Sequence, residues 1–108
     1  MFLDPAIQPN LSLAVEGIIV NTVTAGNTVE INCGYRDNID RGNPVSFLSL
    51  SIDGLSLVEN SSEDIVWIFQ AGREHHGSNI ECSAINEIMD TPATISVEVV
   101  GKYTLSVI

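Results

Sequence analysis

The sequence predicts an all-β chain in which two antiparallel sheets pack face to face as a sandwich. Apolar residues alternate with polar ones in successive short runs, and turn residues interrupt these runs about every ten positions. No stretch has helical spacing, so the parallel alternative, which needs crossover helices, is not supported. With 108 residues, 44% of them hydrophobic, the chain fits one domain with its own core.

The alternating runs give roughly seven or eight short strands, as expected of an antiparallel sandwich. In chain order the runs cover residues 11–15, 29–33, 48–52, 55–58, 65–69, 80–84 and 95–99. Turns are expected at Glu16-Gly17, Ala25-Gly26-Asn27 and Asp53-Gly54, and polar loops over residues 36–44 and 59–63.

The two cysteines, Cys33 and Cys82, each lie in a strand-like run. Neither has a second Cys or a His at metal-ligand spacing, so a structural zinc site is not expected. Two isolated cysteines in an all-β chain predict a disulfide, which joins the two sheets if both side chains point inward. A disulfide in turn indicates an oxidising compartment, and therefore an extracellular or cell-surface location.

The formal charge of −10 limits the classes of partner. Such a surface repels phosphate backbones and anionic lipid, so no nucleic acid or membrane-surface partner is expected. Solubility is the simplest role for this charge, with a basic partner or a bound cation as alternatives. No apolar stretch approaches the roughly 20 residues that cross a bilayer, and residues 1–5 do not have the pattern of a signal peptide. Met1 is interpreted as the start of a cut or mature fragment, although a soluble intracellular chain would begin in the same way. With the expected disulfide, we expect an extracellular fragment that does not itself insert into the membrane.

Three segments resemble the immunoglobulin superfamily. Residues 25–33, AGNTVEINC, resemble the A-G-x-x-V-x-I-x-C entry into strand B, and residues 44–54 resemble strand C with its Asp-Gly turn. Residues 73–86 resemble the turn into strand F with a C-x-A-x-N ending, and are most similar to adhesion receptors of the nectin and nephrin groups. The resemblance covers residues 9–101. It implies an immunoglobulin-like domain over residues 1–102, with residues 103–108 as a prolonged last strand or the start of a linker or next domain.

The core departs from the pattern of that family. The family places a Trp on strand C, where this chain has Leu50, and its only Trp is Trp67 on the expected strand E. The strand register predicts that Trp67 and Phe69 point inward and that the indole contacts the disulfide. A slip of one residue would instead expose Trp67 and bury Val66 and Ile68. The remaining expected core residues are Leu48, Leu50 and Ile80.

Two further comparisons with the family refine the expected type. Ile80 stands where the family often has a Tyr that makes a corner hydrogen bond, so that bond is lost. The short distance from Gly54 to Ile65 leaves room for one strand only, which indicates a constant-like or intermediate type and not an antibody-like combining site.

The sequence offers no set of residues for catalysis, and neither an enzyme activity nor a cofactor or metal is expected. His75 and His76 are adjacent on an expected turn and are interpreted as solvated, with a pH-sensitive or metal contact as the alternative. A nucleophile, a base and an orienting acid are not brought together by any motif. Carboxylates at Asp37 and Asp40, and at 59, 63 and 64, do not have EF-hand spacing and are interpreted as solvated loops.

Two N-glycosylation sequons are present, at Asn10-Leu11-Ser12 and Asn60-Ser61-Ser62. Asn60 is the stronger candidate because its surroundings are more loop-like.

The expected outer face of strands C, F and G is the predicted contact surface for a protein partner, which could be another copy of the chain; strand G adds Ser96 and Glu98 to it. Its residues are small and mostly uncharged: Ser49, Ser51, Glu81, Ser83 and Ile85. Val66 and Ile68 on the other sheet are the alternative surface. The expected function is protein recognition by a domain of an adhesion protein or receptor, with a structural spacer or a secreted immune-type module as alternatives; this step rests on analogy of fold.

Overall fold

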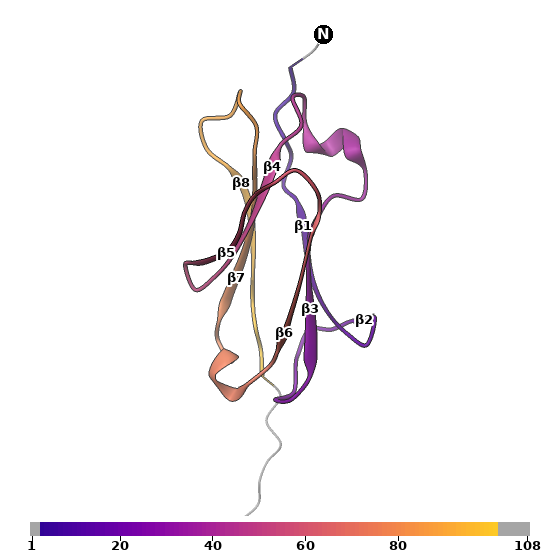
Figure 1. Ribbon diagram of the computed structural model, residues 1–108, viewed down its shortest axis with the longest axis vertical. Helices are drawn as coiled ribbons and strands as arrows, with labels where there is room; N and C mark the ends of the chain where they lie inside the picture. Colours follow the sequence, from indigo (N-terminus) through magenta and orange to yellow (C-terminus); the bar gives the residue numbers. More distant parts are fainter. Residues whose placement is uncertain (1–2, 102–108) are drawn as a thin grey trace, which may run out of the picture.

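Two antiparallel four-stranded sheets face each other in the computed structural model, which describes residues 3–101 (Figure 1). The first sheet has the order β2 (Ile18–Ile19), β1 (Asn10–Val15), β3 (Thr28–Gly34) and β6 (Ile65–Gln70). The second has the order β5 (Leu55–Ser61), β4 (Phe47–Ile52), β7 (Asn79–Ile85) and β8 (Ala93–Glu98). Two short 3-10 helices, η1 (Asn38–Arg41) and η2 (Arg73–His75), lie in loops. The predicted strand or linker over residues 103–108 lies outside the described residues.

The alternating apolar and polar residues of the sequence lie on opposite sides of each sheet. On β3, Val29, Ile31 and Cys33 are buried, while the residues between them are half-buried on the outer side. On β7, Ile80 and Cys82 are likewise fully buried. Because side chains alternate between the faces of a strand, this spacing directs one apolar set into the core. The predicted immunoglobulin-like sandwich is confirmed.

The predicted disulfide joins the two sheets. Cys33 on β3 and Cys82 on β7 are bonded, with their Cα atoms 5.8 Å apart and a sequence separation of 49. Closing a loop of that length restricts the unfolded chain and stabilises the fold by about 4 kcal/mol on the chain-entropy estimate.

The core lies between the sheets, around this disulfide. Leu48, Leu50 and Ile80 are almost completely buried, and Leu50 lies opposite Cys82 in the β4–β7 register. Leu50 therefore occupies the neighbourhood where the family places its Trp. Among residues 3–101, no large aromatic residue is fully buried there.

Trp67 and Phe69 lie on the inner side of β6, as the predicted register requires. Both are only partly buried and pack against the core, whereas Val66 and Ile68 are 57% and 63% exposed. Their burial is incomplete because β6 is an edge strand with β3 as its one neighbour in the described sheet. The residue paired with Cys33 is Ile65. Contact between the Trp67 indole and the disulfide stays a prediction.

The single strand between β4 and β6 joins the second sheet. β5 pairs with β4 and is not a neighbour of β6. It also runs to Ser61, so the expectation of a polar loop from residue 59 was wrong for residues 59–61. The extension depends on an irregular register: Asn60 adopts a φ of 53°, and its N–H donates to the Ser49 hydroxyl at 3.2 Å. That hydrogen bond forms only in the folded chain, so the alternation of polar and apolar residues could not predict it.

Two tight hairpins set the turns. Asp53 and Gly54 have φ values of 49° and 81°, the positive values of a two-residue type I′ turn between β4 and β5. Glu16 and Gly17 also have positive φ, and their turn connects β1 to β2. The strand β2 was not predicted from the sequence. It is too short to carry an alternation signal.

Candidate interaction surface

The outer side of the first sheet carries a row of residues that crosses all its strands. The strand register places Ile19, Ala14, Glu30 and Ile68 side by side on β2, β1, β3 and β6. Val66 lies in the next row, opposite Asn32. Ile19 is 67% exposed, close to the values for Val66 and Ile68. We call the surface formed by Ala14, Ile19, Glu30, Val66 and Ile68 the aliphatic face.

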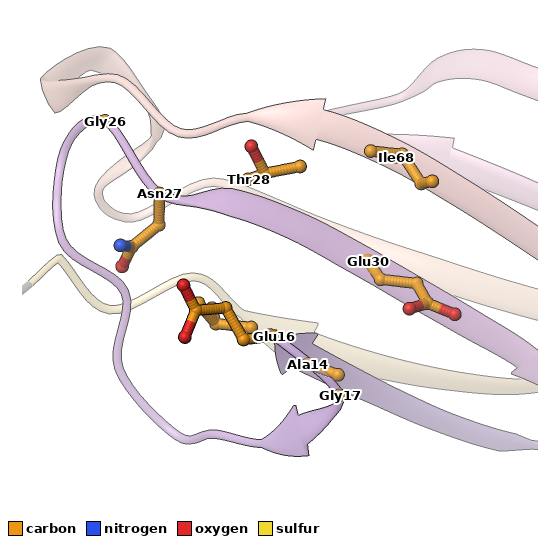
Figure 2. A pocket seen from close by; sticks show the side chains of 9 residues that line it. Ala14, Glu16, Gly17, Gly26, Asn27, Thr28, Glu30 and Ile68 are labelled. Atoms are coloured by element: carbon orange, nitrogen blue, oxygen red, sulfur yellow. The ribbon is translucent and has the colours of Figure 1, made fainter.

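Two open hollows mark this face. One lies between the Glu16-Gly17 turn and the Gly26-Asn27 turn, and Glu30 and Ile68 lie farther along the sheet (Figure 2). A second hollow is lined by residues that include Ile19 and Val66. A sheet surface with exposed branched side chains and shallow relief is suited to contact with a protein surface, because it offers apolar area but does not enclose a small molecule.

Glu30 gives the aliphatic face its charge. It is half-buried and lies between Ala14 and Ile68 in the row, so apolar residues flank the acid on the two neighbouring strands. A partner that covers this face removes water from the carboxylate. Its best complement is therefore a basic side chain placed among apolar ones.

The predicted serine-rich surface also exists as one face, on the outer side of the second sheet. The register places Ser49 beside Ser83, and Ser51 beside Glu81. The sequence analysis did not include Phe47, which is 49% exposed and pairs with Ile85. Its position two residues before Ser49 is the signal that could have found it. Whether a partner binds this surface stays a prediction.

An ion pair at one end of the sandwich was missed by the sequence analysis. Arg41 is 6% exposed; its Nη1 lies 2.8 Å from Asp64 Oδ1 and its Nη2 donates to the Ser62 carbonyl at 2.7 Å. Asp64 also accepts the Tyr35 N–H at 3.3 Å. Asp64 lies between β5 and β6 with its side chain 53% exposed, so the interpretation as a solvated loop carboxylate holds, but it missed the pair with Arg41. The one available signal was the small number of basic residues, 4 Lys and Arg against 14 Asp and Glu, which makes each basic residue a candidate for an ion pair.

Tyr35 and Asn86 fasten the N-terminal segment to the same end. The Tyr35 hydroxyl donates to the Ile7 carbonyl at 2.5 Å, and burial raises the pKa of that phenol above its usual 10.0. The Asn86 amide donates to the Asp4 carbonyl at 2.7 Å and to the Pro44 carbonyl at 2.9 Å. These contacts are structural and offer no reactive group.

The two histidines bind backbone groups on different segments. The Nδ1 atom of His75 accepts the Gly72 N–H at 2.8 Å, and its ring meets Phe69 edge-on with centroids 4.9 Å apart. The Nδ1 atom of His76 accepts the Gly101 N–H at 2.9 Å. Both are thus more than solvated turn residues. Over residues 3–101, no group of three or more His, Cys, Asp or Glu side chains is arranged to hold a metal ion.

Both sequons lie on strands with exposed asparagines. Asn10 begins β1 opposite Gly34, and Asn60 lies near the end of β5. Glycosylation at either position stays a prediction.

No family model, curated protein or solved structure matches this chain. In the part of the chain that the structure describes, no helix is long and apolar enough to cross a membrane.

Proposed function

We propose that this chain is a recognition module of the immunoglobulin superfamily, of constant-like or intermediate type, in an extracellular or cell-surface protein. It binds another protein through the aliphatic face. The observation that carries the proposal is the row of Ile19, Ala14, Glu30 and Ile68 across the sheet, with Val66 beside it.

The energetics of this row support recognition over a spacer role. Burying an isoleucine side chain contributes about 1.5–3 kcal/mol, so Ile19, Val66 and Ile68 together can supply much of the free energy of a modest interface. A spacer domain does not need exposed aliphatic residues on its outer side. Polar residues at these positions would leave the fold equally stable. The disulfide supports the proposed location, because such bonds persist in oxidising compartments.

A binding screen tests the proposal. The chain, made tetrameric by fusion to a tag, is applied to an array of purified ectodomains of cell-surface and secreted proteins from the same organism. At least one ectodomain should bind, and Ile19→Arg should weaken its binding at least tenfold, because the change places a large cation on the apolar row. Glu30→Gln should weaken it less, by removing the charge from a face that accepts a basic partner.

Ser83→Arg is the matched control, since it places the same side chain at the centre of the serine-rich surface. Binding that survives Ile19→Arg but is lost in Ser83→Arg would move the contact to the second sheet. An array without any bound ectodomain would overturn the recognition role. Circular dichroism and thermal unfolding of each variant establish that the fold is intact.

A further inference from the structure

The sequon at Asn10 lies on the same side of the first sheet as the aliphatic face. Ala14 belongs to that face, and Asn10 and Ser12 precede it on β1 at intervals of two residues. Side chains separated by two positions on a strand point to the same side of the sheet. Asn10 and the Ser12 hydroxyl, the two residues that define the sequon, are therefore both directed to the outer side of the first sheet.

The Asn10 side chain is accessible. It is exposed, and within residues 3–101 its amide has no hydrogen-bond partner. Its neighbour on β3 is Gly34, which has no side chain of its own to cover the amide. A sugar attached to the amide nitrogen would therefore break no hydrogen bond of the fold.

Asn10 borders one of the two hollows on the aliphatic face, and the lining of that hollow suits a sugar chain. Ser12 and Asn32 contribute polar groups, and Val66 and Ile19 contribute apolar surface. Sugar rings carry hydroxyl groups, which can pair with hydroxyl and amide side chains, and C–H groups on their faces, which can cover aliphatic ones. The hollow is open, so an oligosaccharide can lie along it and stay in contact with water.

We propose that Asn10 carries an N-linked glycan, and that this glycan lies over the hollow between Asn10 and Val66. The register places Val66 two strands across from β1 and two residues along it. The Cα atoms of Asn10 and Val66 are therefore about 12 Å apart, a distance that a branched oligosaccharide of several rings can span. Glycans are bulky and solubilising, so this one would shield exposed aliphatic surface from non-specific contact.

The modification is a group transfer. A bond forms between Nδ2 of Asn10 and the anomeric carbon of an oligosaccharide, and the bond from that carbon to a diphosphate oxygen of a lipid-linked donor breaks. The lipid diphosphate leaves, the nitrogen loses one proton, and nothing is oxidised or reduced. The donor and its transferase belong to the secretory pathway, so the proposal rests on the extracellular location in the proposed function.

The second sequon has a different place on the molecule. Asn60 is exposed near the end of β5, the edge strand of the second sheet. A glycan on Asn60 would not start from the aliphatic face. The two asparagines therefore offer the same modification on opposite sheets, which makes Asn60 a matched comparison for Asn10.

A glycan on Asn10 would divide the aliphatic face into a covered part and an open part. Glu30 and Ile68 lie about 14 Å farther along the strands than Asn10. They line the other hollow, beyond the one that Asn10 borders (Figure 2). The glycan would therefore restrict a protein partner to the end of the face that contains Glu30 and Ile68.

Secretion of the whole chain from a eukaryotic cell, with a cleavable secretion signal, tests the modification. Mass spectrometry before and after treatment with peptide N-glycosidase should show that Asn10 carries a glycan. Asn10→Gln and Ser12→Ala should each lack this glycan, whereas Ser12→Thr, which keeps the sequon, should retain it. An unmodified Asn10 in the secreted, folded chain would overturn the proposal.

Cysteine labelling tests where the glycan lies. Asn32→Cys introduces a thiol beside Ser12, and Ser83→Cys is its matched control, because each position is half-buried, next to a disulfide cysteine and on an internal strand of its sheet. A maleimide attached to a bulky polymer should react with Asn32→Cys several-fold more slowly in the glycosylated chain than in the same chain with Asn10→Gln. Its reaction with Ser83→Cys should not depend on Asn10→Gln, and Asn60→Gln should not change the rate at Asn32→Cys.

Labelling of Ile68→Cys tests the division of the face. Its rate should change much less on removal of the Asn10 glycan than the rate at Asn32→Cys. Equal rates at Asn32→Cys with and without the glycan would overturn the proposed position, and equal slowing at both thiols would overturn the open part of the face. None of these measurements needs a partner, so the glycan can be absent while the ectodomain array yields a ligand, and it can be present while the array yields none.

Discussion

The two sheets are alike on their inner sides and different on their outer sides. Each contributes one half of the disulfide and a set of fully buried aliphatic residues, such as Ile31 from the first and Leu50 from the second. On the outside, the first sheet exposes isoleucine and valine beside Glu30, whereas the second exposes serines together with Phe47 and Glu81. Packing in the core determines which residues occupy the inner sides of both sheets. The outer sides are not constrained by core packing, so the difference between their residues is the better indication of function.

The largest expected effect comes from separating the two sheets covalently. The double variant Cys33→Ala and Cys82→Ala should lose about 4 kcal/mol in the free energy of unfolding, since the unfolded chain regains the freedom of a long loop. Urea denaturation measures the loss. Ser83→Ala, next to one of the cysteines, is the control and should change the free energy of unfolding by less than about 0.5 kcal/mol. Equal stability of the cysteine-free chain would mean that packing alone holds the sheets together.

A second pair of variants compares inner and outer aliphatic residues. Leu50→Ala should lower the free energy of unfolding by about 2–5 kcal/mol, because it leaves a cavity beside Cys82. Ile68→Ala removes a similar side chain from the outer side and should cost less than about 1 kcal/mol, consistent with its 63% exposure. Denaturant midpoints measured on both proteins at equal concentration test this. Similar losses would show that the aliphatic face belongs to the folding core.

A smaller effect is expected from the ion pair between Arg41, in the loop after β3, and Asp64, directly before β6. Asp64→Asn leaves the buried Arg41 without its anionic partner, and we expect a loss of about 1–2 kcal/mol in the free energy of unfolding. The full cost of breaking a buried pair does not apply, because the Asp64 side chain is 53% exposed and solvent screens the interaction. Glu63→Gln is the neighbouring control. Thermal unfolding that is the same for both variants would remove Arg41 from the contacts that hold this end.

The smallest expected effect is a decline of stability at alkaline pH. Burial raises the pKa of Tyr35 in the folded chain above its unfolded value of 10.0. The unfolded chain therefore loses the phenol proton first, so the contribution of Tyr35 is complete below pH 10.0 and is lost as the pH rises through the folded pKa. Tyr35→Phe should flatten this part of the profile of unfolding free energy against pH, and an unchanged profile would contradict the assignment.

Alternation of apolar and polar residues predicted the inner sides correctly because burial is set locally, by the side of the strand that a residue occupies. The same signal could not say which sheet β5 would join, since an alternating strand satisfies either neighbour. That choice is made by the two-residue turn at Asp53 and Gly54, which pairs β5 with β4. The Arg41–Asp64 pair was hidden because it joins residues 23 positions apart in sequence. Two charged residues in separate loops look solvated until the fold brings them together.

The position of the disulfide has a mechanical consequence. The chain enters the sandwich at one pole and leaves β8 toward the other, so tension between its ends acts along the strands (Figure 1). Such tension could unravel the segments before Cys33 and after Cys82, but it would bypass the 49-residue span that the covalent bond closes. At about 3.4 Å per extended residue, the segment closed by the disulfide would add roughly 170 Å of contour length if it were extended, and the intact bond prevents that extension. Only a reductant would release it, so the redox state of the surroundings would set how far the molecule can stretch.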